Sequence, residues 1–291
     1  AAAARQLVGA SRPLSWVNTA YPFAAAYLMA GGGLTAELVV GTVFFLVPYN
    51  LAMYGINDVF DYESDLRNPR KGGVEGIVLA SRWHRLTLWW ACLLPVPFVL
   101  ALLWWGSWAS AAVLVVTLVA VVAYSAPGMR FKERPVVDSM TSSAHFVGPA
   151  AFGLALTGAP LTTTAAVSLL AFFLWGMASQ MFGAVQDVVP DREGGLASVA
   201  TVLGARRTVL LAAGLYAAAG LLLLATDPPG PLAALLAVPY VVNTLRFRRV
   251  TDATSGAAHR GWQLFLPLNY VTGFLVTLLL IGWALTRGAA A

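Results

Sequence analysis

Charged residues are scarce in this chain of 291 residues, where Asp, Glu, Lys and Arg together make up 11% of the sequence. A soluble globular protein carries roughly 25% charged residues. Hydrophobic residues make up 59% of the chain, so the composition excludes an ordinary soluble domain and indicates a protein embedded in a lipid bilayer. Although the length alone would allow two domains, we expect a single transmembrane domain over residues 1–291.

Cysteine is nearly absent as well, because the chain has only Cys92. A single cysteine excludes an internal disulfide and a metal site built from several thiolates. The N-terminus lacks a short apolar run that ends in a small-residue cleavage site, so we expect no signal peptide. The net charge is +5, but the basic residues lie in short loops between apolar segments. We therefore expect a lipid bilayer and no nucleic acid as a partner.

Long apolar runs are what the chain has in abundance. A helix needs about 20 mostly apolar residues to cross a bilayer, and on this basis the sequence predicts nine transmembrane helices. Their expected ranges are 14–34, 37–58, 86–105, 108–126, 137–157, 164–186, 207–226, 231–246 and 264–286. We therefore predict an all-α polytopic membrane protein.

The distribution of charge gives this topology a direction. If the N-terminus is cytoplasmic, every Lys and Arg except Arg287 falls on the cytoplasmic side, which is where positive residues are retained. Among the acidic residues, only Glu37 and Asp227 fall on the opposite side. We therefore expect an integral protein of the cell membrane whose active-site mouth is cytoplasmic.

Two acidic clusters interrupt the apolar sequence, NDVFDYESD at 57–65 and QDVVPD at 186–191. The first closes the second predicted span, and the other closes the sixth. Because four spans separate the clusters, the two helices run in the same direction and both clusters emerge on the same side. This pattern predicts a bundle of two parallel four-helix halves plus one final helix, with related carboxylate groups facing each other.

The spacing within the clusters points to a divalent metal. Asn57 and Asp61 stand four residues apart, as do Asp187 and Asp191, and an offset of 130 residues relates the two pairs. Residues four apart share a helical face, where like charges repel. Mg²⁺ offsets such repulsion and prefers a few carboxylates together with phosphate oxygens and water. The alternative is that both clusters are solvated helix ends with chance spacing.

A basic loop, RFKER at 130–134, follows the fourth predicted span. Arg130, Lys132 and Arg134 alternate within it, and Tyr124 ends the helix before it. A polybasic loop beside a bilayer commonly contacts anionic lipid. A diphosphate clamp fits the same pattern, because Arg gives planar bidentate contacts to phosphate and Lys a point charge. Both interpretations stay open on the residues alone.

These motifs resemble the UbiA superfamily of intramembrane prenyltransferases. NDVFDYESD fits its NDxxDxxxD motif, QDVVPD fits its second DxxxD motif, and YSAPGMRFK resembles its Tyr-containing cytoplasmic loop. Longer stretches, among them SRPLSWVNTAYPF and LWGMASQMFGAVQDV, are most similar to the lycopene elongase branch, the carotenoid prenyltransferases. The chain departs from the pattern where Lys71 follows Arg70 in place of proline, and where Gly195 replaces a third acid.

The resemblance implies a reaction and a set of residues for it. A dimethylallyl group would leave its diphosphate with Mg²⁺ assistance, and the end of an acyclic carotenoid such as lycopene would capture the allyl cation. The implied metal-binding residues are Asn57, Asp58, Asp61, Asp65, Asp187 and Asp191, with a supporting role behind the ligands as the alternative for Asp58. The implied diphosphate-binding residues are Arg67, Arg70, Lys71, Arg130, Lys132 and Arg192. The expected catalytic residues are Asp61, Asp187, Asp191, Tyr124 and Lys132.

Two other functions stay open. The acceptor of the same chemistry could instead be an aromatic acid, a quinone precursor, a chlorophyllide or a glycerol phosphate. A transporter is the second alternative, although transporters place their substrate sites near the bilayer midplane, whereas these acids stand at helix ends. His84, His145 and His259 are scattered, and for His145, within the fifth span, we expect a helix–helix hydrogen bond.

Overall fold

The computed structural model describes residues 2–66 and 79–288, and this described part of the chain contains helices and no strands. It forms two compact units. Unit 1 comprises residues 1–132 and 144–160, and unit 2 comprises residues 133–143 and 161–291. Arg67, Arg70 and Lys71 lie outside the described residues.

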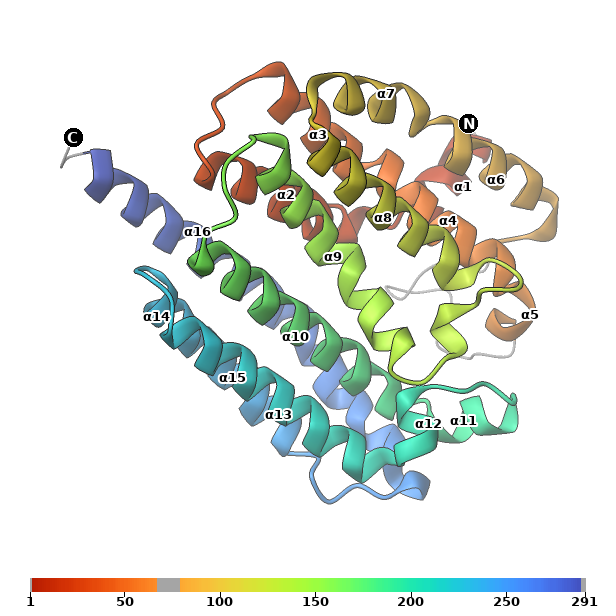
Figure 1. Ribbon diagram of the computed structural model, residues 1–291. Helices are drawn as coiled ribbons and strands as arrows, with labels where there is room; N and C mark the ends of the chain where they lie inside the picture. The colour runs from red at the N-terminus through yellow and green to blue at the C-terminus, as the bar shows by residue number, and fades with distance from the viewer. Residues whose placement is uncertain (1, 67–78, 289–291) are drawn as a thin grey trace. The chain divides into compact units, whose positions relative to one another are not determined.

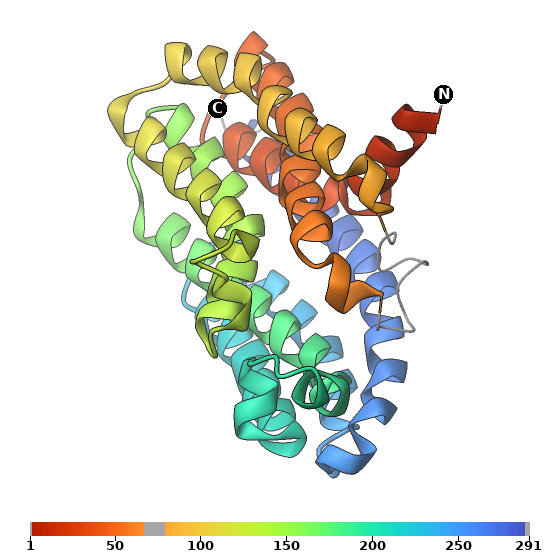
Figure 2. The same ribbon diagram turned by 90° about the vertical axis from the view of Figure 1, so that its right-hand side faces the viewer.

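Unit 1 is built mainly from antiparallel helices (Figure 1). Its helices are α1 (Ala2–Ala10), α2 (Val17–Met29), α3 (Ala36–Leu46), α4 (Pro48–Phe60), α5 (Tyr62–Asp65), α6 (His84–Leu93), α7 (Val96–Trp105) and α8 (Trp108–Ser125), with the short turns η1 (Pro13–Ser15) and η2 (Ser81–Trp83). The turn η3 (Phe131–Glu133) begins in unit 1, and its last residue belongs to unit 2. Helix α9 (Val137–Leu156) begins in unit 2 and belongs to unit 1 from Ala144. The pairs α2 with α3 and α4 with α6 lie side by side (Figure 2).

An aromatic core holds unit 1 together. Phe23, Phe44, Phe45 and Phe152 are all fully buried, and the Phe44 and Phe45 ring centroids lie 4.7 Å apart. Such rings bury a large apolar area each and gain a further ~0.5–1.5 kcal/mol per pair from their mutual geometry. This core packs α2, α3 and α9 against one another, and α4 follows directly after α3.

The second predicted span is divided at Pro48 into α3 and α4. Proline lacks an N–H and so leaves a carbonyl of the preceding turn without its helical partner. At this break the buried Asn50 side chain donates from Nδ2 to the backbone oxygens of Phe45 (2.8 Å) and Leu46 (3.1 Å) in the last turn of α3. The helix therefore continues past the break, and α4 delivers the first acidic cluster at its C-terminal end.

Unit 2 combines long helices with several helices of only four to six residues. They are α10 (Thr163–Val185), α11 (Val188–Glu193), α12 (Val199–Leu203), α13 (Ala205–Leu224), α14 (Gly230–Ala233), α15 (Ala237–Leu245) and α16 (His259–Gly288), with the turns η4 (Ala234–Leu236) and η5 (Asp252–Ala258). Helices α10, α13 and α15 pack side by side. Two buried tyrosines join them, because Tyr216 shares a 2.9 Å hydrogen bond with Ser179 of α10 and stacks on Tyr240 of α15.

Helices occupy all nine ranges that the sequence predicts to be spans. Within the described residues, six stretches are long and apolar enough to cross a bilayer: Ala36–Phe60, Ser81–Trp105, Trp108–Ser125, Thr163–Val185, Ala205–Leu224 and Asp252–Thr286. Gly230–Leu245 is apolar but shorter, α2 has 13 residues, and α9 carries several polar residues, among them His145. The all-α membrane fold is confirmed, whereas the count of nine crossings stays a prediction.

The boundary between the two units differs from the predicted boundary between the two four-helix halves. The prediction assigns four spans to each half and one to the end, but the boundary between the units falls inside α9. The fifth predicted span therefore contributes to both units, and unit 2 contains the last four predicted spans. That the whole chain acts as a single domain stays a prediction.

Candidate functional site: two acidic helix junctions

The first acidic cluster lies where α4 ends. Asn57 is in the last turn of α4, and Asp61 is its C-terminal cap, with φ −99° and ψ 0°. The Asp61 N–H donates to the Asn57 carbonyl at 2.9 Å, so the two residues stand one helical turn apart, as their spacing predicts. Asn57 Oδ1 accepts a 2.8 Å hydrogen bond from Ser125 Oγ. That bond ties the cluster to the end of α8, from which the basic loop departs.

Two basic residues of the loop at 130–134 lie beside Asp61. Lys132 Nζ forms an ion pair with Asp61 Oδ1, and Arg130 Nη2 lies 3.9 Å from the same oxygen. The Lys132 and Asp61 side chains are only 12% and 13% exposed, so their attraction is screened less than that of a surface pair. Two implied diphosphate-binding residues, Arg130 and Lys132, thus lie beside the implied metal ligand Asp61 within unit 1.

Asp58 faces a different partner from its neighbours in the motif. Its side chain is fully buried, and its Oδ1 lies 2.8 Å from Nη2 of Arg12. The Arg12 guanidinium also lies over the Tyr54 ring, 4.2 Å from the centroid. Successive helical residues point about 100° apart, so Asp58 turns away from the face of Asn57. This geometry favours the alternative role for Asp58, in which it supports the ligands from behind.

Arg12 lies outside the acidic and basic motifs of the sequence. It lies just before η1 with a positive φ of 49°, 46 positions from Asp58. The available signal is its place in SRPLSW, a stretch that already carries the family resemblance. Helical periodicity does not reveal such a partner, because the pair joins segments 46 positions apart.

Tyr124 and His145 meet within unit 1. Their ring centroids lie 5.1 Å apart at an interplanar angle of 79°, an edge-to-face contact. His145 Nε2 lies 3.3 Å from the Ala120 carbonyl of α8, which is the helix–helix hydrogen bond expected for this residue. This edge-to-face contact orients the ring of Tyr124. The next residue of α8 is Ser125, which donates the hydrogen bond to Asn57.

The second acidic cluster lies at an analogous junction in unit 2. Helix α10 ends at Val185, Asp187 precedes α11, and Asp191 lies inside α11. Asp187 has φ −99° and ψ 0°, the same values as Asp61. Each of these two residues therefore stands at the break between a long helix and a short one.

This match corrects the register between the clusters. The offset of 130 residues aligns Asn57 with Asp187, but the equal junctions align Asp61 with Asp187, an offset of 126. In the corrected register Asp65, the last residue of α5, corresponds to Asp191 of α11. The place of the helix break decides the register, and spacing between acids alone does not reveal it.

The donor chemistry of the clusters suits Mg²⁺. Carboxylate and amide oxygens are the hard ligands that this ion takes, and it usually keeps one or two carboxylates plus water and phosphate. Within the part of the chain that the structure describes, no group of three or more His, Cys, Asp or Glu residues comes together as a metal site. The carboxylate and amide oxygens of the two clusters fit Mg²⁺ by their chemistry, since this ion takes hard oxygen ligands.

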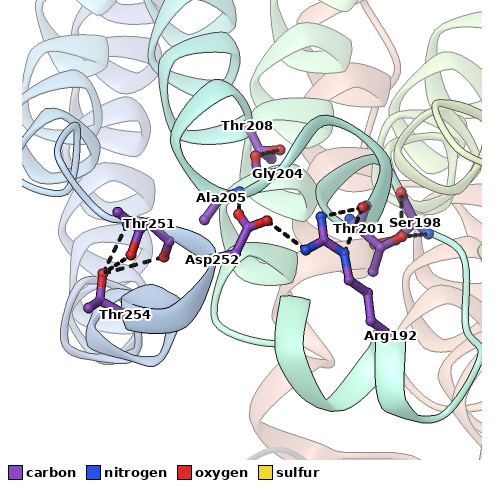
Figure 3. A network of polar contacts seen from close by, with 9 residues as sticks. All are labelled: Arg192, Ser198, Thr201, Gly204, Ala205, Thr208, Thr251, Asp252 and Thr254. Carbon is purple, nitrogen blue, oxygen red and sulfur yellow. Dashed lines mark hydrogen bonds and ion pairs between the residues drawn. The ribbon is translucent and has the colours of Figure 1, made fainter.

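Arg192 of α11, a predicted diphosphate ligand, is engaged within unit 2. Its Nη1 lies 2.6 Å from Asp252 Oδ2, and its Nε and Nη2 donate to the Thr201 carbonyl at 3.0 and 2.7 Å (Figure 3). Asp252 and Thr201 are not among the residues that the sequence motifs indicate. The structure thus places this arginine in a network that joins three segments of unit 2.

Similar proteins extend over nearly the whole chain. It is 50% identical to a lycopene elongase/hydratase of Corynebacterium glutamicum over 95% of this chain and 96% of that protein. It is 55% identical to the C(50) beta-cyclic carotenoids biosynthesis protein LbtBC of a Dietzia species, over 93% of this chain and 63% of that longer protein. A lycopene elongase/hydratase of Halobacterium salinarum is 31% identical over 94% of this chain and 96% of its own length.

Solved structures show the same fold. A UbiA homolog from Archaeoglobus fulgidus bound to DMAPP and Mg²⁺ has a TM-score of 0.67 at 18% identity, over 92% of this chain and 98% of that one. The apo structure of a UbiA homolog from Aeropyrum pernix K1 has a TM-score of 0.66 at 17% identity, over 90% and 98%. The UbiA prenyltransferase family itself matches residues 19–269. The resemblance found in the motifs is confirmed, and the chain belongs to the UbiA prenyltransferase family.

Proposed function

We propose that this prenyltransferase of the lycopene elongase type moves a dimethylallyl group from its diphosphate to the end of an acyclic carotenoid such as lycopene. The observation that carries the proposal is the 50% identity to a lycopene elongase/hydratase over 95% of one chain and 96% of the other. The acidic junctions and the loop cations supply the local chemistry that the reaction needs. The enzyme is an integral membrane protein, and we propose that it lies in the cell membrane with its N-terminus and active-site mouth on the cytoplasmic side.

The metal would be held by Asn57, Asp61, Asp65, Asp187 and Asp191, in accordance with the family motifs. When bound, Mg²⁺ neutralises the charge that develops on the departing diphosphate. Lys132 and Arg130, which already lie at Asp61, would bind the diphosphate oxygens through charge-assisted hydrogen bonds. Tyr124 would donate a further hydrogen bond to the leaving group. Arg67, Arg70 and Lys71 are proposed to assist from outside the described residues.

The bonds balance as follows. The carbon–oxygen bond of the donor breaks, the diphosphate keeps the electron pair, and the terminal double bond of the carotenoid attacks the allyl cation. The positive charge then lies on the extended carotenoid, which either loses a proton or captures water and then loses a proton. Because several of the similar proteins are named elongase/hydratase, we propose the capture of water. The allyl cation itself must meet the alkene first, which requires a site that excludes bulk water.

The decisive test is a product analysis. Purified enzyme with Mg²⁺, dimethylallyl diphosphate and lycopene should give a product heavier by one isoprene unit plus one water for each end extended. A product heavier by the isoprene unit alone would replace hydration with proton loss. Prenylation of an aromatic acid, a quinone precursor, a chlorophyllide or a glycerol phosphate in place of lycopene would overturn the acceptor but keep the prenyl transfer.

A comparison of three carotenoids tests which acceptors the enzyme prenylates. Apolar contact discriminates poorly, by about 1–3 kcal/mol per methylene, so lycopene and a lycopene extended at one end should both react. β-Carotene should not react, because ring closure has consumed the terminal double bond. Transport is tested separately, since substrate flux without isoprenoid turnover in reconstituted liposomes would contradict the enzyme assignment.

A further inference from the structure

The second acidic cluster is held at both ends by one short segment of unit 2. This segment is η5, Asp252–Ala258, together with His259, the first residue of α16. At one end, His259 Nδ1 lies 2.6 Å from Oε1 of Gln186, the residue before Asp187. At the other end, Asp252 Oδ2 lies 2.6 Å from Nη1 of Arg192, the residue after Asp191. Helix α11 also packs against η5.

The contact at Gln186 has a defined direction. Gln186 Nε2 donates to the Gly183 carbonyl at 3.0 Å, which assigns the other amide atom as the oxygen. An amide oxygen only accepts, so His259 Nδ1 carries the proton and donates. The residue before Asp187 is thereby tied both to its own helix α10 and to the start of α16.

Arg192 and Asp252 make further hydrogen bonds in addition to their ion pair (Figure 3). Asp252 Oδ1 accepts the Ala205 backbone N–H at 2.7 Å, which is one of the donors that the first turn of α13 leaves without a helical partner. Arg192 also donates to the Thr201 carbonyl in α12 through Nε and Nη2. The guanidinium thus joins α11, α12 and the η5–α13 contact.

The approach of Asp252 to α13 is close enough to select glycine at the junction. Gly204 has φ +81°, and a Cβ built on it would lie 3.0 Å from Asp252 Oδ1. A positive φ and a close neighbour are both conditions that glycine meets at little cost. Gly204 therefore leaves room for the Asp252 carboxylate, and Ala205 donates its backbone N–H to it.

We infer that η5 and His259 form a clamp that positions Asp187 and Asp191, with Asp252 and His259 as positioning residues. In this assignment Arg192 orients the acidic cluster and is not a ligand of the diphosphate. Three of its N–H groups are already used by Asp252 and Thr201. The inference rests on the proposed function only in that Asp187 and Asp191 bind the metal.

The clamp acts locally. The Arg192 and Asp252 side chains are 43% and 40% exposed, and an exposed ion pair contributes little to global stability. Loosening it should therefore leave the melting temperature nearly unchanged and raise the mobility of residues 187–196. Partners that lie behind metal ligands change metal affinity by ~10–100-fold when they are removed.

The test uses Arg192→Ala, Asp252→Asn and the double variant of the full chain, with Arg207→Ala as the matched control. Asp252→Asn keeps an oxygen for the Ala205 N–H and removes the charge that faces Arg192. Each single variant should raise the Mg²⁺ concentration for half-maximal activity about tenfold, with an unchanged KM for lycopene. The double variant should be no worse than the worse single one, because both remove the same interaction. Arg207, exposed on α13, should have no effect.

A diphosphate-binding Arg192 gives the opposite pattern. Asp252→Asn would then release the guanidinium and lower the KM for the donor, while Arg192→Ala would raise it. Opposite signs in the two variants would overturn the clamp.

Hydrogen–deuterium exchange separates the clamp from the proposed function. The backbone amides of residues 187–196 should exchange faster in both single variants than in the wild type and in Arg207→Ala. Unchanged exchange overturns the clamp whatever the activity. Faster exchange in an enzyme that does not prenylate lycopene overturns the acceptor assignment and supports the clamp.

Discussion

The two acidic junctions share a backbone and differ in what surrounds them. Asp61 and Asp187 both have φ −99° and ψ 0° between a long helix and a short one. In unit 1 two loop cations, Lys132 and Arg130, lie directly at the acid. In unit 2 the neighbouring arginine, Arg192, bonds to Thr201 and Asp252. The repeated geometry therefore belongs to the acids, whereas the cations differ: they lie at the acid itself in unit 1 and in a network with Thr201 and Asp252 in unit 2.

Replacing the two equivalent acids should have the largest effect. Asp61→Ala and Asp187→Ala should each lower turnover more than about a hundredfold, because removal of a ligand exceeds the effect of changing a partner behind it. Neither change opens a large apolar cavity, so the protein should stay folded. Turnover is measured by product mass and folding by circular dichroism in detergent. Near-normal activity of either variant contradicts the metal assignment.

The ion pair between the fully buried Asp58 and the partly exposed Arg12 gives the largest expected loss of stability. Arg12→Ala leaves the Asp58 carboxylate buried without this partner, and breaking a buried pair on one side costs about 3–5 kcal/mol. Thermal unfolding in detergent measures the loss. In the double variant Arg12→Ala/Asp58→Asn the charge is gone, so part of the stability should return. A double variant as unstable as the single one would mean that the charge is not the cause.

Much of this arrangement could be predicted from the sequence, and the missing parts share a physical reason. The apolar runs predict the helices, and the acids at their ends predict both clusters. Each of these features can be recognised within one continuous stretch of sequence. Arg12 and Asp252 could not be predicted, since each meets its partner from a distant segment, 46 and 60 positions away along the chain. Thr201 lies nearer to Arg192 but accepts through its backbone carbonyl, which the residue type does not reveal. The offset of 130 residues failed for a related reason. It counts acids, whereas the helix breaks at Asp61 and Asp187 decide the register.

Lys132 tests whether the cations of unit 1 bind the donor. A hydrogen bond to a charged group contributes ~1.5–3 kcal/mol, so Lys132→Ala should raise the KM for dimethylallyl diphosphate about tenfold to a hundredfold. Lys132→Arg keeps the charge and should recover part of the affinity. The KM for lycopene should not change, because the acceptor is uncharged. Equal rises in both KM values would indicate a general disturbance of the fold.

His259 should give the smallest effect and sharpen the description of unit 2. It acts on the acidic cluster only through Gln186, by one hydrogen bond of 2.6 Å, and such a bond contributes about 0.5–1.5 kcal/mol. His259→Ala should therefore raise the Mg²⁺ concentration for half-maximal activity about two- to tenfold. His259→Asn retains a side-chain N–H near the place of Nδ1 and should act as the wild type does. If both variants behave alike, the hydrogen bond to Gln186 does not position Asp187, and the support of that junction comes from the Asp252 end alone.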